Sequence, residues 1–232
     1  MLKDKPGDPA KPGIDRQQLH AIVTEVAILE RCARCPHIIT LLDVAKVGLR
    51  YCLVFEPWGT SLSHAKNKVA HLLSGGNLRS IFQQTLKALC FLHASEVVHC
   101  DVKPSNILVK LELEDDAIEV DRYEHVPIQL KLADFGSSQV ADPARRPRIT
   151  KATLQHDMQQ ITTINYRAPE IVFGDIEFGT GIDLWALGIM MLHLAGVSFT
   201  YCEEAQEPAG LVRAWFYQLG TPRGEELAKL QS

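Results

Sequence analysis

One short stretch in the middle of the chain constrains the fold more than any other feature. Residues 98–109 read VHCDVKPSNILV, which sets Asp101, Lys103 and Asn106 in close succession after one apolar run and before another. The following run, residues 106–109, is rich in branched apolar side chains and predicts a strand. A histidine and an aspartate at a strand end are usually a satisfied surface pair, so this stretch decides nothing by itself.

Three further motifs follow in a fixed order. Residues 132–136 read LADFG after an apolar run, residues 166–170 read YRAPE, and residues 181–188 read GIDLWALG. An isolated Asp-Phe-Gly is an ordinary turn, and an isolated Ala-Pro-Glu is a weaker signal still. Motifs gain meaning from their order and context, and here all of them follow the expected strand, loop and helix patterns.

Together these stretches resemble the catalytic loop, the D-F-G element, the A-P-E element and the central helix of the eukaryotic-type protein kinase domain. The resemblance implies an α+β, two-lobed fold and a transfer that uses ATP and Mg²⁺. It makes Asp101 the base, Lys103 the phosphate partner, and Asn106 and Asp134 the metal ligands. Thr163 would hydrogen-bond the aspartate and the lysine, and Asp183 would hold the backbone of the catalytic loop.

The resemblance extends to the helix near the start of the chain. Glu25 matches the carboxylate that pairs with an ATP-positioning lysine, and Lys3 is the candidate lysine. The separation is long, but a longer loop costs little free energy. The alternatives are a solvated face residue for Glu25 and a disordered terminal lysine for Lys3.

The same resemblance assigns the adenine contacts. Residues 53–58 read LVFEPW and are similar to the fifth strand and the hinge, with Phe55 as gatekeeper. Backbone groups of Glu56 and Trp58 would meet the adenine edge. Leu108 would lie under the ring, although a buried strand residue would look the same without a ligand.

The YRAPE stretch and residues 219–222 (LGTP) resemble the branch that contains cyclin-dependent, MAP and dual-specificity Tyr-regulated kinases. The resemblance implies transfer to Ser or Thr of protein substrates, often before proline, and it allows an activating subunit.

The chain also departs from the family. Gly7 and Gly13 do not form a G-x-G-x-x-G loop, and the last helices have no counterpart, so we expect a domain truncated at both ends. We expect Glu170 to be a buried carboxylate without its usual partner. Cys100 stands where most relatives carry the arginine that receives an activation-loop phosphate. The alternative function is a catalytically inactive kinase-fold fragment that acts as a binding or regulatory module.

Apolar periodicity predicts the remaining elements. We expect a partial small lobe over residues 1–56 and a large lobe over residues 57–232. The predicted helices span residues 15–35, 77–93, 184–197 (as a buried central helix) and 211–219, and the predicted strands span residues 37–44, 49–55, 106–109 and 128–133. The apolar face of the first helix is predicted from residues that recur at three- and four-residue steps: Leu19, Ile22, Val23, Val26 and Leu29.

Composition excludes other classes. The net charge of -4 gives no electrostatic basis for nucleic-acid binding, and the longest apolar stretch is shorter than the roughly 20 residues of a membrane helix. Cys32 and Cys35 have metal-like spacing, but no second pair follows them, and structural zinc takes four ligands. The start of the chain lacks the apolar core of a signal peptide, and scattered thiols indicate an intracellular protein, cytoplasmic or nuclear.

Overall fold

The computed structural model describes residues 16–48, 50–68, 75–111, 128–140, 162–173, 178–197, 208–221 and 223. The helices of three turns or more are α1 (Arg16–Cys32), α3 (Gly75–Ala94), α5 (Gly181–Leu194) and α6 (Pro208–Leu219). The shorter helices are α2 (Leu62–Lys68), α4 (Pro169–Val172), and the 3-10 turns η2 (Pro104–Asn106) and η5 (Ile164–Tyr166). The strands are β1 (Leu41–Val47), β2 (Arg50–Phe55), β3 (Thr60–Ser61), β4 (Val97–Val98), β5 (Ile107–Leu111), β6 (Ile128–Leu132) and β7 (Gln139–Val140).

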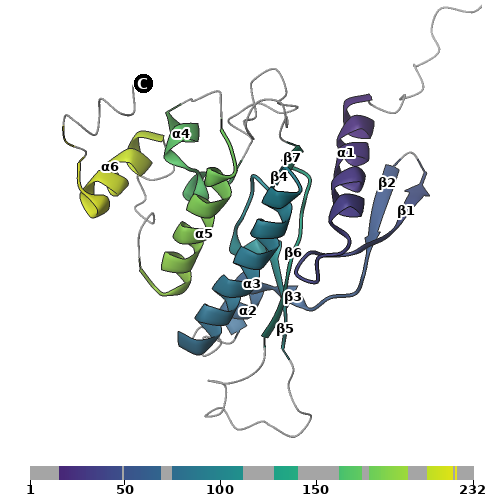
Figure 1. The fold of residues 1–232 in the computed structure, drawn as a ribbon, viewed down its shortest axis with the longest axis horizontal. Helices are drawn as coiled ribbons and strands as arrows, with labels where there is room; N and C mark the ends of the chain where they lie inside the picture. The colour runs from purple at the N-terminus through teal and green to yellow at the C-terminus, as the bar shows by residue number, and fades with distance from the viewer. Residues whose placement is uncertain are drawn as a thin grey trace, which may run out of the picture.

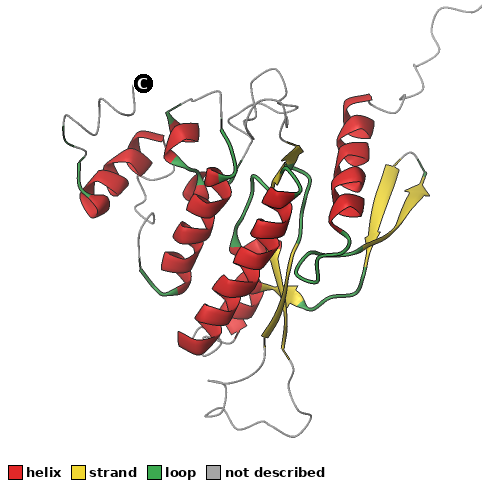
Figure 2. Cartoon of the chain, viewed as in Figure 1, coloured by secondary structure: helices red, strands yellow, loops and turns green. Residues whose placement is uncertain are grey.

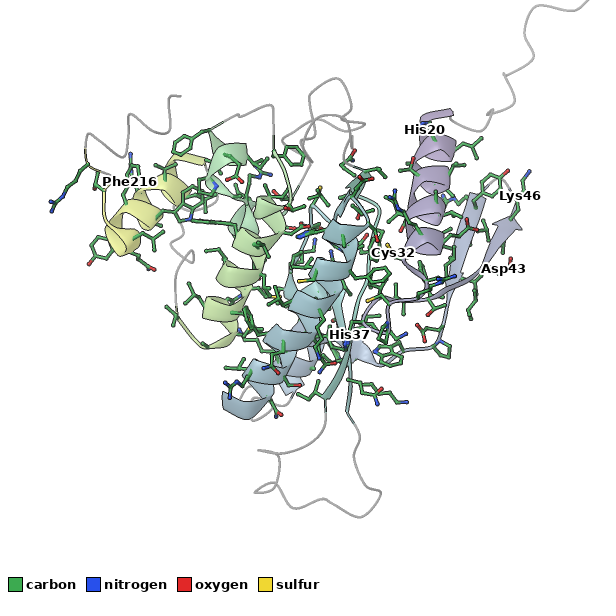
Figure 3. All side chains as sticks on the ribbon, viewed as in Figure 1. His20, Cys32, His37, Asp43, Lys46 and Phe216 are labelled. Atoms are coloured by element: carbon green, nitrogen blue, oxygen red, sulfur yellow. The ribbon has the colours of Figure 1, made fainter. Side chains whose placement is uncertain are left out.

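Helix α1 forms where the periodicity predicted it and ends three residues earlier, because Cys35 closes a turn onto the carbonyl of Cys32. The predicted apolar face is partly wrong. Ile28, Leu29 and Cys32 are buried, whereas Val23 is 58% exposed. Cys32 and Cys35 are buried free thiols at the inner end of this helix, where Figure 3 labels Cys32.

Strands β1 and β2 form an antiparallel two-stranded sheet beside α1 (Figure 1). The first predicted strand was placed too early, since β1 begins at Leu41 rather than at His37. The backbone of residues 37–39 is hydrogen-bonded instead to Leu132 of β6. The carbonyl of His37 accepts from the amide of Leu132 at 2.8 Å, and the amide of Ile39 donates to the carbonyl of Leu132 at 2.9 Å. This connection ties the α1–β1 turn to the sheet that carries the site, and Figure 3 places His37 beside that sheet.

The second sheet has the order β3-β5-β6 and is antiparallel throughout, with Ile107 opposite Leu132. Strands β5 and β6 match the predicted runs to within two residues. A short β4–β7 pair lies above this sheet in Figure 1. It joins the segment just before residues 99–106, which we call the catalytic stretch, to the segment that follows Asp134.

Helix α3 packs against β6 on one side and α5 on the other (Figure 2). One core runs through these elements and includes Ile81, Leu89, Leu132 and Phe135, each 1% exposed or less. The helix starts at Gly181, as the resemblance of residues 181–188 to a central helix implies, and ends at Leu194. The prediction that it is buried on all sides is wrong, because Leu184 is 47% exposed. Helix α5 is therefore buried on one face rather than on all sides.

Mixed helices and antiparallel sheets confirm the α+β class. The division of the chain after residue 56 stays a prediction. Among the described residues, none of the helices has the length and apolar character needed to cross a membrane.

Candidate active site

Four polar side chains from two distant segments meet at the end of β4. The Oδ1 atom of Asp101 accepts hydrogen bonds from the backbone amide (3.0 Å) and the hydroxyl (2.8 Å) of Thr163. Its Oδ2 atom lies 2.6 Å from Nζ of Lys103 and accepts from the side-chain amide of Asn106 at 3.2 Å. Lys103 also donates to the Thr163 hydroxyl at 2.9 Å. The structure thus brings together all the residues predicted for the reacting centre except Asp134.

Two opposing effects set the charge of Asp101. Burial raises the pKa of this carboxyl, but the bonds from Lys103 and Thr163 outweigh it and hold the pKa below its ordinary value of 3.8. Asp101 is therefore a carboxylate at neutral pH and is oriented on both oxygens. Its side chain is 12% exposed, so its accepting atoms lie at the edge of the solvent.

His99 links this cluster to the segment that carries Asp134. The ring is fully buried; its Nδ1 accepts from the amide of Asp101 at 3.2 Å, and its Nε2 lies 3.1 Å from the carbonyl of Ala133. The acceptor role of Nδ1 assigns the ring proton to Nε2. The amide of Ala133 donates in turn to the carbonyl of Asn106 at 2.9 Å. The catalytic stretch and the stretch before Asp134 are thereby held together through backbone groups.

The carboxylate of Asp183 holds the backbone of the catalytic stretch in place. This carboxylate on the first turn of α5 is 1% exposed and accepts from the backbone amides of His99 (2.8 Å) and Cys100 (2.9 Å). Nε2 of His93 on α3 lies 2.9 Å from its Oδ2. Cys100 has φ 69°, in the left-handed region, and Asp183 secures the backbone around that strained residue. The carboxylate joins α3, α5 and the catalytic stretch.

Asp134 stands at a second left-handed position, with φ 66°, and its side chain is exposed, while the neighbouring Phe135 is 1% exposed. Glu25 reaches this turn from α1 and accepts a hydrogen bond from the amide of Phe135. Burial and the charge of Asp134 together raise the pKa of Glu25 above its ordinary value of 4.5. Glu25 therefore faces the turn at Asp134 and is not a solvated surface residue.

The donor set fits Mg²⁺. Asn106 uses its amide nitrogen on Asp101, and among the described residues its Oδ1 oxygen has only a 3.4 Å contact from the hydroxyl of Ser105. Asp134 presents an exposed carboxylate. Mg²⁺ prefers such hard oxygen ligands and keeps several waters, so two protein side chains are a sufficient anchor.

The predicted hinge follows β2. Phe55 and Leu108 are partly buried against the main core, as is Trp58. The amide of Glu56 donates to the carbonyl of Thr40 at 3.0 Å. Sequence reasoning missed the partner of the Glu56 side chain: Lys131 lies 2.5 Å from its Oε1. Alternation along β6 places Lys131 on the polar face with Gln129, so the sequence held no signal for this buried pair.

Other expectations have mixed outcomes. Cys100 is a buried thiol, 1% exposed, and burial raises its pKa well above the ordinary value of 9.0. Glu170 was expected to be buried, which is wrong: it is half-buried, and it has no ion pair within the described ranges. Solvent at the end of α4 reduces the penalty for an unpaired carboxylate there. Lys3 lies outside the described residues.

Acidification should destabilise the fold through the buried His99 and the half-buried His193. Burial lowers the pKa of His99 and of His193 below the ordinary value of 6.5, and Lys66 adds to the effect at His193. The unfolded chain then binds more protons, so the stabilisation is complete above about pH 6.5 and is lost as the pH falls below it. We expect the urea midpoint to be lower at pH 5.5 than at pH 7.5, with up to about 1.4 kcal/mol per pH unit from the buried His99 and a smaller, solvent-screened contribution from His193.

Glu25 titrates in the opposite sense, because its raised pKa favours the folded state as the pH falls. The informative comparison is therefore between the chain and its His193→Gln variant. The variant should lose part of the pH dependence, and equal pH dependence in the two proteins would contradict the assignment for His193.

Comparisons with known proteins agree with this geometry. The family described as protein kinase domain matches residues 10–214. Cell division control protein 2 homolog 3 of Trypanosoma brucei brucei is 32% identical over 87% of this chain and 56% of its own length. Cyclin-dependent kinase 20 of Rattus norvegicus is 30% identical over 77% of this chain and 44% of its own length. Mitogen-activated protein kinase 15 of Xenopus laevis is 34% identical over 72% of this chain and 25% of its own length.

The predicted resemblance to the cyclin-dependent and MAP kinase branch is confirmed by these relatives. The chain spans about half the length of the first curated relatives that it matches.

Proposed function

Because the chain belongs to the protein kinase family, we propose that it transfers the γ-phosphoryl group of ATP to serine or threonine hydroxyls of protein substrates. The observation that carries the proposal is the Asp101 cluster, in which one ionised carboxylate is held by Thr163, Lys103 and Asn106. Enzymes catalyse phosphoryl transfer mainly by positioning the reactants and stabilising charge, because the reaction needs little covalent chemistry from the protein. A carboxylate held in place in this way suits that task.

Each residue has a defined task in this proposal. The Asp101 carboxylate orients the substrate hydroxyl and accepts its proton, and Thr163 keeps the carboxylate in place. Lys103 presents a cation toward the transferred group. Asn106 and Asp134 would hold Mg²⁺, which neutralises phosphate charge when bound. Backbone groups of Glu56 and Trp58 would bind the adenine edge, with Leu108 below the ring and Phe55 behind it.

The relatives support two finer proposals. The cyclin-dependent name of one relative favours an activating protein subunit. The resemblance to this branch implies a substrate site that precedes proline. The ATP-positioning role of Lys3 belongs with these proposals, because Glu25 lies at the turn that such a lysine would reach.

Thermal unfolding with and without Mg·ATP tests the nucleotide site. A ligand at about 100 times its Kd stabilises the folded state by about 2.7 kcal/mol, so the unfolding midpoint should rise by about 5–10 °C for a chain of this size. The rise should require Mg²⁺ and should disappear in Asp134→Asn. Asp43→Asn, an exposed carboxylate on β1, is the matched control and should keep the shift.

A chain that shows the shift but transfers no phosphate to a general protein substrate would favour the second candidate, a nucleotide-binding regulatory module. No shift with either nucleotide or metal would contradict the nucleotide site and leave a module that binds other partners. Glu25 is the observation behind this second candidate, since it meets Asp134 without a cation between them in the described part of the chain.

A further inference from the structure

A buried lysine stands outside the set of residues assigned so far. Lys131, on β6, is 8% exposed. Its Nζ atom lies 2.5 Å from Oε1 of Glu56 and 4.6 Å from the centre of the Trp58 ring. Removing an ammonium group from water costs several kcal/mol unless it is paired. The ammonium group of Lys131 has two such partners, and both belong to the same four-residue connection after β2.

Glu56 is fixed on more than one side. Its Oε1 also accepts the backbone amide of Thr40 at 2.8 Å, while its own amide donates to the carbonyl of Thr40 at 3.0 Å. Burial raises the pKa of Glu56, but the bonds from Lys131 and Thr40 outweigh burial and lower it below 4.5. Without Lys131 this carboxylate would keep only an uncharged partner.

Cation–π contacts, rather than a hydrogen bond from its own N–H, orient the Trp58 ring. The Nε1 atom is buried and has no acceptor among the described residues. Lys131 lies over the ring, and Lys110 of β5 lies over it at 5.7 Å, which is near the limit of a cation–π contact. Beside the ring, a Cβ at Gly59 would lie 1.9 Å from the carbonyl oxygen of Val109, so the connection runs directly against β5.

We propose that Lys131 is a positioning residue: it clamps residues 56–59 through Glu56 and Trp58 and so fixes the backbone that would read the adenine edge. The inference deepens the proposed function and rests on it for the identity of the ligand. Lys131 also stands three residues before Asp134 on the same segment. The clamp thus sets the spacing between the base-binding backbone and the metal ligand.

The test compares Lys131→Met with Lys110→Met in the full chain. Both changes remove a cation over Trp58, but only the first removes the partner of a carboxylate. In Lys131→Met, amide hydrogen exchange over residues 56–59 should become at least about tenfold faster in the nucleotide-free protein. Affinity for a fluorescent ADP derivative, measured in the presence of Mg²⁺, should fall by about tenfold. Lys110→Met should change both quantities by less than twofold.

Two additional variants keep the test decisive. Lys131→Arg keeps the charge and should restore most of the exchange protection. Lys131→Met combined with Glu56→Gln leaves neither charge unpaired and serves if the single variant does not fold. Unchanged exchange in both the single and the double variant would overturn the inference.

Failure of the inference and failure of the proposed function look different. If the unmodified chain binds ADP and Lys131→Met binds it equally well, the clamp is wrong and the function stands. If the unmodified chain binds no nucleotide, the proposed function fails, and hydrogen exchange alone still decides whether Lys131 holds the connection.

Discussion

Replacing Asp101 by asparagine is expected to lower phosphoryl transfer by about 10²–10⁴-fold, the range for a lost general base. Asparagine has nearly the shape of aspartate and can still accept from Thr163, but it cannot take up a proton at neutral pH. Lys103 loses the carboxylate at 2.6 Å and turns toward the Thr163 hydroxyl that it already contacts at 2.9 Å. The defect should therefore lie in turnover rather than in nucleotide affinity.

The measurement is transfer of radiolabel from ATP to myelin basic protein as a general substrate, in parallel with ADP affinity. Asp43→Asn makes the same chemical change on the exposed surface of β1 and should leave both quantities intact. Transfer within about twofold of the unmodified chain, with unchanged affinity, would remove Asp101 from the role of base.

The second large effect concerns stability. Asp183→Ala should lower the free energy of unfolding by about 2–6 kcal/mol, because each of two buried backbone amides left without an acceptor costs about 1–3 kcal/mol. The change strands the backbone amides of His99 and Cys100 in a site where the carboxylate itself is 1% exposed, and water cannot replace the lost acceptor. The total free energy of unfolding of a domain is only about 5–15 kcal/mol, so such a loss is a large fraction of the total.

Urea unfolding at pH 7.5 measures this effect, with Asp183→Asn as the companion variant. The amide keeps one acceptor oxygen and should lose less than alanine does. Asp43→Asn again supplies the control, because Oδ1 of Asp43 accepts only from the amide of the next residue among the described contacts, and Figure 3 places it on the outer sheet. A midpoint for Asp183→Ala equal to that of the unmodified chain would contradict the role of Asp183 as the support of the catalytic stretch.

Local patterns predicted the elements well and their faces less well. Helix α3 and strand β6 appear within two residues of their predicted bounds, because apolar spacing reports which segments can bury a side. The same spacing put Val23 of α1 on the buried face, yet it is 58% exposed. A helix face is buried only where a neighbouring element covers it, and the spacing of apolar residues does not identify that element. The predicted start of the first strand at His37 is wrong for a related reason, because the carbonyl of His37 accepts a hydrogen bond from Leu132 of β6 instead.

By itself, the sequence determined the residue types of the site and their order along the chain: Asp101, Lys103, Asn106 and Asp134 all stand in short contiguous motifs. Only the tertiary structure decided which long-range partners give those residues their properties. Thr163 reaches Asp101 across 62 positions and Lys131 reaches Glu56 across 75. Such pairs leave no trace in spacing or composition. They form because folding places two segments against each other in a region where an unpaired charge costs several kcal/mol.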